Sequence, residues 1–177
     1  MDRHSSNYYG LLFLIGVFLG LCGYVITGNV TFRSYVMGDS MNPSLYDGEC
    51  VMGIRMNRIH TGLKRGDIVS FCSDDDPHIY VKRIVGLPGE TVIIKDGSLY
   101  IDGSFTALEE PYLIGDWTTD TGPYYFEVPD SCYLVLGDNR NDSYDSRNRD
   151  NPYVDDASIL AKLYFVYRPV YRFRYLY

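Results

Sequence analysis

The chain has 177 residues, 46% hydrophobic and 22% charged, a composition typical of one globular domain and too short for two large ones. Its 23 acidic and 16 basic residues give a formal net charge of −7, which argues against general nucleic-acid binding. Three of the four cysteines lie after residue 30 without CxxC spacing, so at most one disulfide can form there. The three histidines are scattered and form no zinc motif. We therefore expect no metal and no cofactor.

Residues 9–27 form an uncharged run that, as a helix, spans about 29 Å and so just crosses a bilayer. A secretory signal peptide is the alternative, but its apolar region is usually only about 7–15 residues and ends in an Ala-x-Ala-like site, which is absent here. We expect a retained transmembrane anchor at 9–27 after a short cytoplasmic N-terminus at 1–8. The charges around the run give a weak orientation signal, and the preferred topology places 28–177 outside the cytoplasm.

From residue 31 onward the sequence indicates short strands, rich in β-branched and aromatic residues, at 31–37, 68–72, 78–85, 91–102 and 132–138. Asp96-Gly97 suits a tight turn with positive φ, which makes 91–102 a hairpin. The looser sequence that follows completes a β insertion at about 91–130. Only Asp155–Leu163 is predicted as helical, because its acidic pair suits a helix N-terminus. The body is therefore predicted to be mostly β.

The tail from residue 162 to 177 combines basic and aromatic residues and contains no acid. This mixture suits the headgroup region of a membrane. A final pair of core strands is an equally good interpretation, because Val166, Pro169 and Val170 could pack inward.

Ser40 follows the first predicted strand in an irregular turn between Gly38 and Pro43. Such a turn can expose a hydroxyl, but a serine in a turn is far more often a hydrogen-bonded loop residue than a nucleophile. A serine nucleophile needs a base, either a histidine or a neutral lysine. The histidines fit poorly, because His4 precedes the anchor and His60 stands in a basic, loop-like stretch.

Lys82 fits better, because period-two alternation places it between Tyr80 and Ile84 on one face of its strand. Burial there would lower its pKa from about 10.4, and a working base near neutral pH requires roughly 3–4 kcal/mol of desolvation. The alternative is a lysine that extends into solvent from an edge strand or pairs with a carboxylate. Judged by local context alone, this alternative is the commoner case.

Four segments reverse that balance because they occur together and in order: SMNPSL at 40–45, KRGDIVSF at 64–71, YVKRIVGLPGE at 80–90 and GDNRNDSYDSR at 137–147. With the anchor and the KDGSLYIDG hairpin, they resemble the bacterial type I signal peptidases, in a Gram-positive-like form, over nearly the whole chain. The resemblance implies an antiparallel β catalytic core, shared with self-cleaving repressors, and an inserted β subdomain. It also implies a membrane-bound serine endopeptidase that removes signal peptides after a small-x-small motif, through an acyl-enzyme and without a metal.

The resemblance assigns roles to matching residues. Ser40 matches the nucleophile and Lys82 the general base, while Ser40 N–H and the position of Gly38 belong to the oxyanion site. The supporting residues are Arg83 and Asp67 as structural neighbours, Ser143 as a hydroxyl that orients the lysine, Asp145 and Arg147 as a salt-bridged pair, and Gly137 as space beside the lysine. The expected substrate contacts are Tyr35, Met37, Tyr80 and Val81.

Four features depart from the usual family pattern. Ser44 stands where threonine is usual, Glu90 replaces an aspartate, and Asn141-Asp142 reverses the usual Asp-Asn order. Gly38 stands where some members place a hydroxyl that helps to bind the oxyanion. We expect Gly38→Ser to be tolerated and to raise kcat, provided that residue 38 does not need a positive φ. The alternative is that the glycine serves only that backbone conformation.

The expected partners are secretory precursors, membrane lipids and a nearby secretion translocon. Two alternative functions are a related peptidase dedicated to one cargo, such as a pilin or conjugation precursor, and a non-catalytic pilus-assembly relative. The second alternative predicts the loss of Ser40 or Lys82, and both residues are present.

Overall fold

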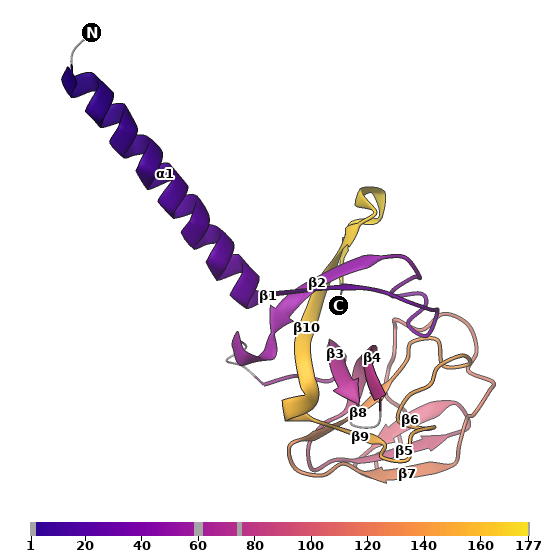
Figure 1. The fold of residues 1–177 in the computed structure, drawn as a ribbon. Helices are drawn as coiled ribbons and strands as arrows, with labels where there is room; N and C mark the ends of the chain where they lie inside the picture. The colour runs from indigo at the N-terminus through magenta and orange to yellow at the C-terminus, as the bar shows by residue number, and fades with distance from the viewer. Residues whose placement is uncertain (1–2, 59–61, 74–75, 177) are drawn as a thin grey trace. The chain divides into compact units, whose positions relative to one another are not determined.

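The computed structural model describes residues 3–58, 62–73 and 76–176, so His60 lies outside the described part. The chain forms two compact units, residues 1–31 and 32–177. Figure 1 shows one helix followed by a body of strands. The elements are α1 (Arg3–Val30), β1 (Thr31–Tyr35), β2 (Cys50–Arg55), η1 (Met56–Arg58), β3 (Ile68–Ser73), β4 (Asp76–Gly86), β5 (Thr91–Lys95), β6 (Ser98–Ile101), β7 (Tyr124–Glu127), β8 (Cys132–Leu136), β9 (Tyr153–Asp155), η2 (Asp156–Ser158), β10 (Ile159–Arg168), η3 (Val170–Arg172) and β11 (Arg174–Tyr175).

The N-terminal helix extends beyond the expected 9–27 at both ends. A helix costs less to extend than to begin, so the polar flanks continue it. Its apolar part, Tyr9–Val30, has a mean hydropathy of 2.3 and is the one helix among the described residues that is long and apolar enough to cross a membrane.

The larger sheet has eight strands in the order β1-β2-β10-β3-β4-β8-β9, with β11 paired to β10. The strand β10 lies between β2 and β3 and is antiparallel to both. The strand β4 is antiparallel to β3 on one side and to β8 on the other. The predicted mostly β, antiparallel body is thereby confirmed.

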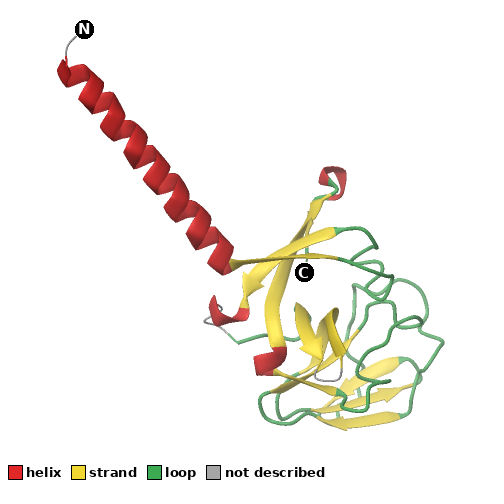
Figure 2. Ribbon diagram, viewed as in Figure 1, coloured by secondary structure: helices red, strands yellow, loops and turns green. Residues whose placement is uncertain are grey.

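The smaller sheet, in the order β6-β5-β7, contains the predicted hairpin. Asp96 and Gly97 have φ values of 50° and 72°, as a tight primed turn requires. The apolar face of the smaller sheet shares one core cluster with Val85, Leu134 and Leu136 of the larger sheet. The smaller sheet therefore covers the larger one and does not bury a separate core. Long loops connect β6 to β7 and β8 to β9 (Figure 2).

The helix predicted at Asp155–Leu163 was wrong. The Asp155 carboxylate does accept the Ala157 N–H, but only the single turn η2 follows it. Ile159, Ala161 and Leu163 are then buried alternately in β10. Hydrogen-bonded partners on both sides, which the local sequence does not reveal, outweigh its helix propensity.

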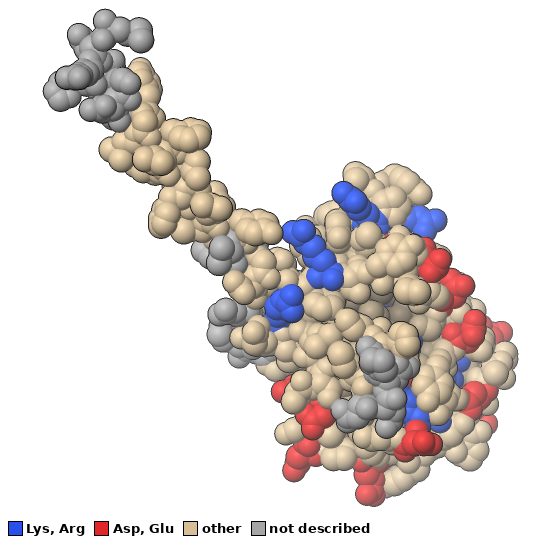
Figure 3. Space-filling view, viewed as in Figure 1, with Lys and Arg blue, Asp and Glu red and all other residues tan. Residues whose placement is uncertain are grey.

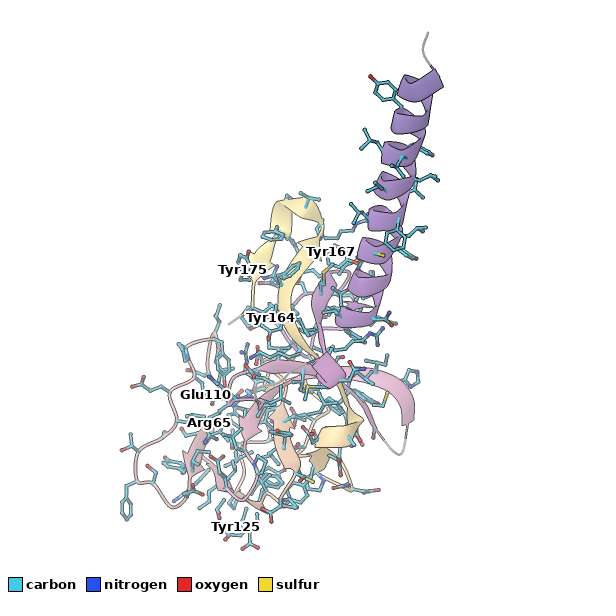
Figure 4. All side chains as sticks on the ribbon, turned by 90° about the vertical axis from the view of Figure 1, so that its left-hand side faces the viewer. Arg65, Glu110, Tyr125, Tyr164, Tyr167 and Tyr175 are labelled. Carbon is cyan, nitrogen blue, oxygen red and sulfur yellow. The ribbon has the colours of Figure 1, made fainter. Side chains whose placement is uncertain are left out.

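The core-strand interpretation holds for only part of the C-terminal tail, and contact of the tail with a membrane stays a prediction. Val166 is fully buried in β10, whereas Val170 and Tyr171 at the tip of the β10–β11 arm are 80% and 84% exposed. Figure 4 shows Tyr164, Tyr167 and Tyr175 along this arm, with Tyr125 of β7 at the opposite end of the unit. In Figure 3 the acidic side chains concentrate toward the end of the unit that carries the smaller sheet.

Candidate active site

The loop between β1 and β2, residues 36–49, carries Ser40 and is called here the Ser40 loop. The Nζ atom of Lys82, on β4, donates a hydrogen bond to Ser40 Oγ at 2.6 Å. β1 and β4 are four steps apart in the strand order, which in a flat sheet corresponds to about 19 Å. The fold of the sheet and of the Ser40 loop therefore brings together two residues that are 42 positions apart in the sequence.

Lys82 lies on an inner strand, because β4 pairs with both β3 and β8, and it is only 4% exposed. Burial lowers the pKa of its ammonium from 10.5 to about 8; the Asp145 and Asp138 carboxylates oppose this effect, and Arg147 reinforces it. The alternative of a lysine reaching solvent from an edge strand is therefore wrong. A neutral lysine beside a serine can accept the hydroxyl proton.

Arg83, next to the lysine, holds three chain segments together. Its guanidinium makes a buried two-point ion pair with Asp138, from Nε to Oδ1 at 2.8 Å and from Nη2 to Oδ2 at 2.6 Å. It also donates to the Gly66 carbonyl at 2.6 Å and to Ser44 Oγ at 3.0 Å. Serine at position 44 keeps the hydroxyl that this arginine binds. Sequence reasoning missed Asp138 as the partner, because no spacing rule joins positions 55 residues apart.

The loop between β8 and β9, residues 137–152, is called here the Arg140 loop. It contains the predicted salt bridge between Asp145 and Arg147. Arg147 donates to Asp145 from Nε and from Nη2, both at 2.9 Å, and the Gly137 N–H donates to the same carboxylate at 2.9 Å. Burial raises the pKa of Asp145, but the hydrogen bond and charge of Arg147 outweigh it and lower the pKa overall. Asp145 is thus a charged group near the buried lysine.

Gly137 has no room for a side chain. A Cβ atom there would lie 2.2 Å from Ser143 Oγ and 2.4 Å from the Ser40 carbonyl oxygen. The same carbonyl accepts the Asn139 N–H at 3.0 Å, so the Arg140 loop lies directly against the Ser40 loop. Ser143 Oγ is buried beside the Asp145 carboxylate, and a hydrogen bond from this hydroxyl helps to lower the pKa of Asp145. The expected role of Ser143 in orienting Lys82 stays a prediction.

Asn141, which comes first in the reversed Asn-Asp order, binds the loop between β6 and β7. Asn141 Oδ1 accepts the backbone N–H groups of residues 118–119 at 2.8 and 2.9 Å, and its Nδ2 donates to the Asp116 carbonyl at 2.9 Å. An aspartate could not donate this last hydrogen bond. Arg140 adds a two-point ion pair with Glu110, at 2.5 and 3.0 Å. The sequence carries no signal for these contacts, because they depend on where the insertion folds.

Gly38 has a φ of +83°, and its N–H donates to Asp47 Oδ1 at 2.8 Å. The condition attached to Gly38→Ser is therefore not met, and a serine there is expected to be strained instead of tolerated. The Gly38 N–H is engaged and does not serve as a second oxyanion donor in this arrangement. The Ser40 N–H has no hydrogen-bond acceptor within the described part of the chain.

The four expected substrate contacts fall into two classes. Tyr35 and Met37, on either side of the start of the Ser40 loop, are 59% and 83% exposed. Tyr80 and Val81 are half-buried, and the Tyr80 ring stacks on Phe71 with centroids 5.9 Å apart. The exposed pair is the more accessible to a peptide, and all four assignments stay predictions.

Two further carboxylates, those of Asp67 and Glu90, make structural hydrogen bonds and ion pairs. Asp67 accepts the Lys64 N–H at 2.9 Å and forms a 2.6 Å ion pair with Lys162. Glu90 accepts the Leu87 N–H at 2.7 Å and pairs with Arg65 at 2.6 Å. Asp67 therefore joins its turn to β10, and Glu90 joins its turn to the turn that carries Arg65.

Comparisons with known proteins relate this chain to one family. The family model described as signal peptidase, peptidase S26, matches residues 8–168. Signal peptidase I S of Bacillus subtilis is 45% identical over 133 residues, covering 68% of each chain. Signal peptidase IB of Staphylococcus aureus is 33% identical over 182 residues, covering 93% of each chain. A solved signal peptidase I structure from Enterococcus faecalis is 35% identical and covers 58% of this chain and 97% of its own, with a TM-score of 0.46.

The family match covers most of the helix, both sheets except β11, and the Ser40 and Arg140 loops. The relatives do not favour a cargo-dedicated peptidase or a non-catalytic pilus-assembly protein. The chain therefore belongs to the signal peptidase family, peptidase S26, as a bacterial type I signal peptidase, a serine endopeptidase that removes signal peptides.

Proposed function

We propose that Ser40 is the nucleophile of this peptidase and Lys82 its general base. The observation that carries the proposal is the 2.6 Å contact between Lys82 Nζ and Ser40 Oγ. It is supported by the lowered pKa of about 8, which leaves a useful fraction of the lysine neutral near pH 7.

In the proposed reaction, Lys82 accepts the Ser40 hydroxyl proton while Oγ forms a bond to the scissile carbonyl carbon. The Ser40 N–H stabilises the resulting oxyanion. When the intermediate collapses, the C–N bond breaks and the lysine ammonium returns its proton to the leaving amine, which becomes the N-terminus of the mature protein. Water, deprotonated by Lys82, then attacks the acyl carbon; the C–Oγ bond breaks and the lysine ammonium returns its proton to Ser40 Oγ. The signal peptide leaves with a new carboxylate.

The surrounding residues keep this pair in place. Arg83 joins the Ser40 loop to Asp138, and Gly137 lets the Arg140 loop approach the Ser40 carbonyl. Arg147 and Asp145 form a nearly neutral buried pair, which limits how far the carboxylate can raise the pKa of Lys82. Ser143 is proposed to orient the lysine when substrate or water is bound.

We further propose that cleavage follows a small-x-small motif, with Tyr35, Met37, Tyr80 and Val81 along the substrate. The apolar helix is proposed to remain as an anchor, with the N-terminus in the cytoplasm and the catalytic unit outside, near the secretion translocon. The exposed tip of the β10–β11 arm is proposed to contact lipid, since apolar and aromatic side chains with nearby arginines suit the headgroup region.

The purified full-length protein, incubated with an exported precursor, should cut it once after a small-x-small sequence, as mass spectrometry of both products will show. Ser40→Ala and Lys82→Ala should each abolish cleavage, because nucleophile and base act as one unit. Cleavage by folded Ser40→Ala at more than a few per cent of the parental rate would reject the assignment.

A further inference from the structure

Glu49 is a buried carboxylate that the proposed mechanism does not use. It is the last residue of the Ser40 loop and is 0% exposed. Arg174, in β11, makes a two-point ion pair with it, from Nη1 to Oε1 at 2.7 Å and from Nη2 to Oε2 at 2.5 Å. The Tyr46 N–H donates to Oε2 at 3.0 Å, and Arg172 Nη1 lies 3.7 Å from Oε1. The carboxylate is thus held by residues at both ends of the catalytic unit's sequence.

This ion pair lies where the Ser40 loop closes. The Val36 N–H donates to the Glu49 carbonyl at 2.8 Å, and the Gly48 N–H returns a hydrogen bond to the Val36 carbonyl at 3.0 Å. Arg174 Nη2 also donates to the Ser44 carbonyl at 2.7 Å, while Arg83 binds the Ser44 hydroxyl. The arginines of β4 and β11 therefore hold the same residue of the loop.

A change in the position of Ser44 is expected to shift Ser40, because a few close contacts connect the two residues. The Leu45 N–H donates to the Met41 carbonyl at 2.9 Å, and both side chains are buried, with exposures of 0% and 2%. Met41 directly follows Ser40 in the sequence. The 40–45 turn is thus a tight unit, and the Glu49–Arg174 pair holds its C-terminal side.

Stability alone is a weak reason for such a pair, because apolar residues of similar volume are often equally stable in its place. A guanidinium bonded at two points to a carboxylate additionally fixes direction and register, which apolar packing does not. Such fixation matters where reacting atoms must stay within tenths of an ångström.

We propose that Glu49 and Arg174 are positioning residues for the nucleophile: their ion pair holds the Ser40 loop so that Ser40 Oγ stays at 2.6 Å from Lys82 Nζ. The proposal rests on the proposed Ser40–Lys82 function and extends it to a C-terminal residue 125 positions after Glu49. Neither residue of the pair touches the reacting atoms. Its loss therefore affects the chemical step more than substrate binding.

Arg174→Lys tests this directly, because it keeps the positive charge and removes the two-point geometry. Arg33→Lys is the matched control, an exposed arginine on β1 outside the ion pair. For both full-length variants, kcat and KM are measured in detergent micelles with a fluorogenic precursor peptide, and the thermal midpoint is measured in the same buffer. We expect kcat of Arg174→Lys to fall tenfold or more, about 1.4 kcal/mol, with KM within twofold and most of the protein folded. The control should match the parent.

Glu49→Gln provides a second variant of nearly the same shape, and Ser40→Ala is assayed beside both. Parental kcat in folded Arg174→Lys and Glu49→Gln would overturn the proposal. So would a loss of activity that only follows the unfolded fraction, or the failure of both variants to fold, because the pair would then be purely structural. Activity in Ser40→Ala would reject the proposed nucleophile and this inference with it. An inactive Ser40→Ala beside a fully active Arg174→Lys would reject only the positioning role.

Discussion

The pH dependence of cleavage is the sharpest test of the buried lysine. With a pKa of about 8, roughly 9% of Lys82 is neutral at pH 7 and about 90% at pH 9. Because only the neutral amine accepts the serine proton, kcat/KM should rise about tenfold over this interval and level off above it. An ordinary lysine at 10.5 would instead give a rise of about a hundredfold with no plateau by pH 9. The two cases differ in the size of the rise in kcat/KM and in whether the pH profile reaches a plateau.

The assay is single-substrate cleavage by the full-length protein between pH 6 and pH 10, with a precursor peptide that has no ionisable side chain near the cut. A circular-dichroism spectrum at each pH controls for unfolding. A rate that is flat from pH 7 to pH 9 would refute a lysine base. A hundredfold rise without a plateau would refute the effect of burial on its pKa.

The same burial has a consequence for stability. The folded pKa of Lys82, about 8, lies below its ordinary value of 10.5, so the folded state binds fewer protons between these values and stability rises with pH across this window. Below about pH 8 the buried ammonium costs the folded state about 3 kcal/mol. Lys82→Met should therefore raise the thermal midpoint at pH 7 and lose this advantage near pH 10. An equal shift at both pH values would contradict the linkage.

Gly38→Ser and Gly38→Ala should lower kcat by similar factors, because both strain a φ of +83°; a tenfold advantage of the serine variant in single-turnover cleavage would instead indicate an oxyanion role for its hydroxyl. Gly137→Ala should lower cleavage at least a hundredfold or prevent folding, because its Cβ would lie 2.2 Å from Ser143 Oγ; near-parental activity would show that the two loops can separate. A soluble form starting at Arg33 should bind anionic vesicles at low salt in flotation assays, and Arg168→Ser with Arg172→Ser should weaken this binding; unchanged binding would exclude these arginines as the contact.

Local sequence patterns were sufficient for the elements whose signals lie within a few residues. The uncharged run at 9–27 predicted the helix, and Asp96-Gly97 predicted the hairpin, because a dipeptide suited to positive φ determines its own turn. The alternation around Lys82 allowed a buried lysine with a lowered pKa, but local context alone favoured an exposed or paired one, and the structure shows that Lys82 is buried. The same local reasoning failed at Asp155–Leu163, where pairing with β2 and β3 outweighs helix propensity.

The same distinction between local and long-range information applies to the active site. The sequence by itself determined which residue types are present for nucleophilic catalysis, and the four ordered segments identified the family. The resemblance paired Ser40 with Lys82, and the tertiary structure shows their contact. Only the tertiary structure decided that Asp138 rather than a nearby residue pairs with Arg83, and that Arg174 closes the Ser40 loop on Glu49. These contacts join positions 42, 55 and 125 residues apart. Their partners are selected by how the sheet curves and where its loops cross, which depends on the burial of the whole core and on no single segment.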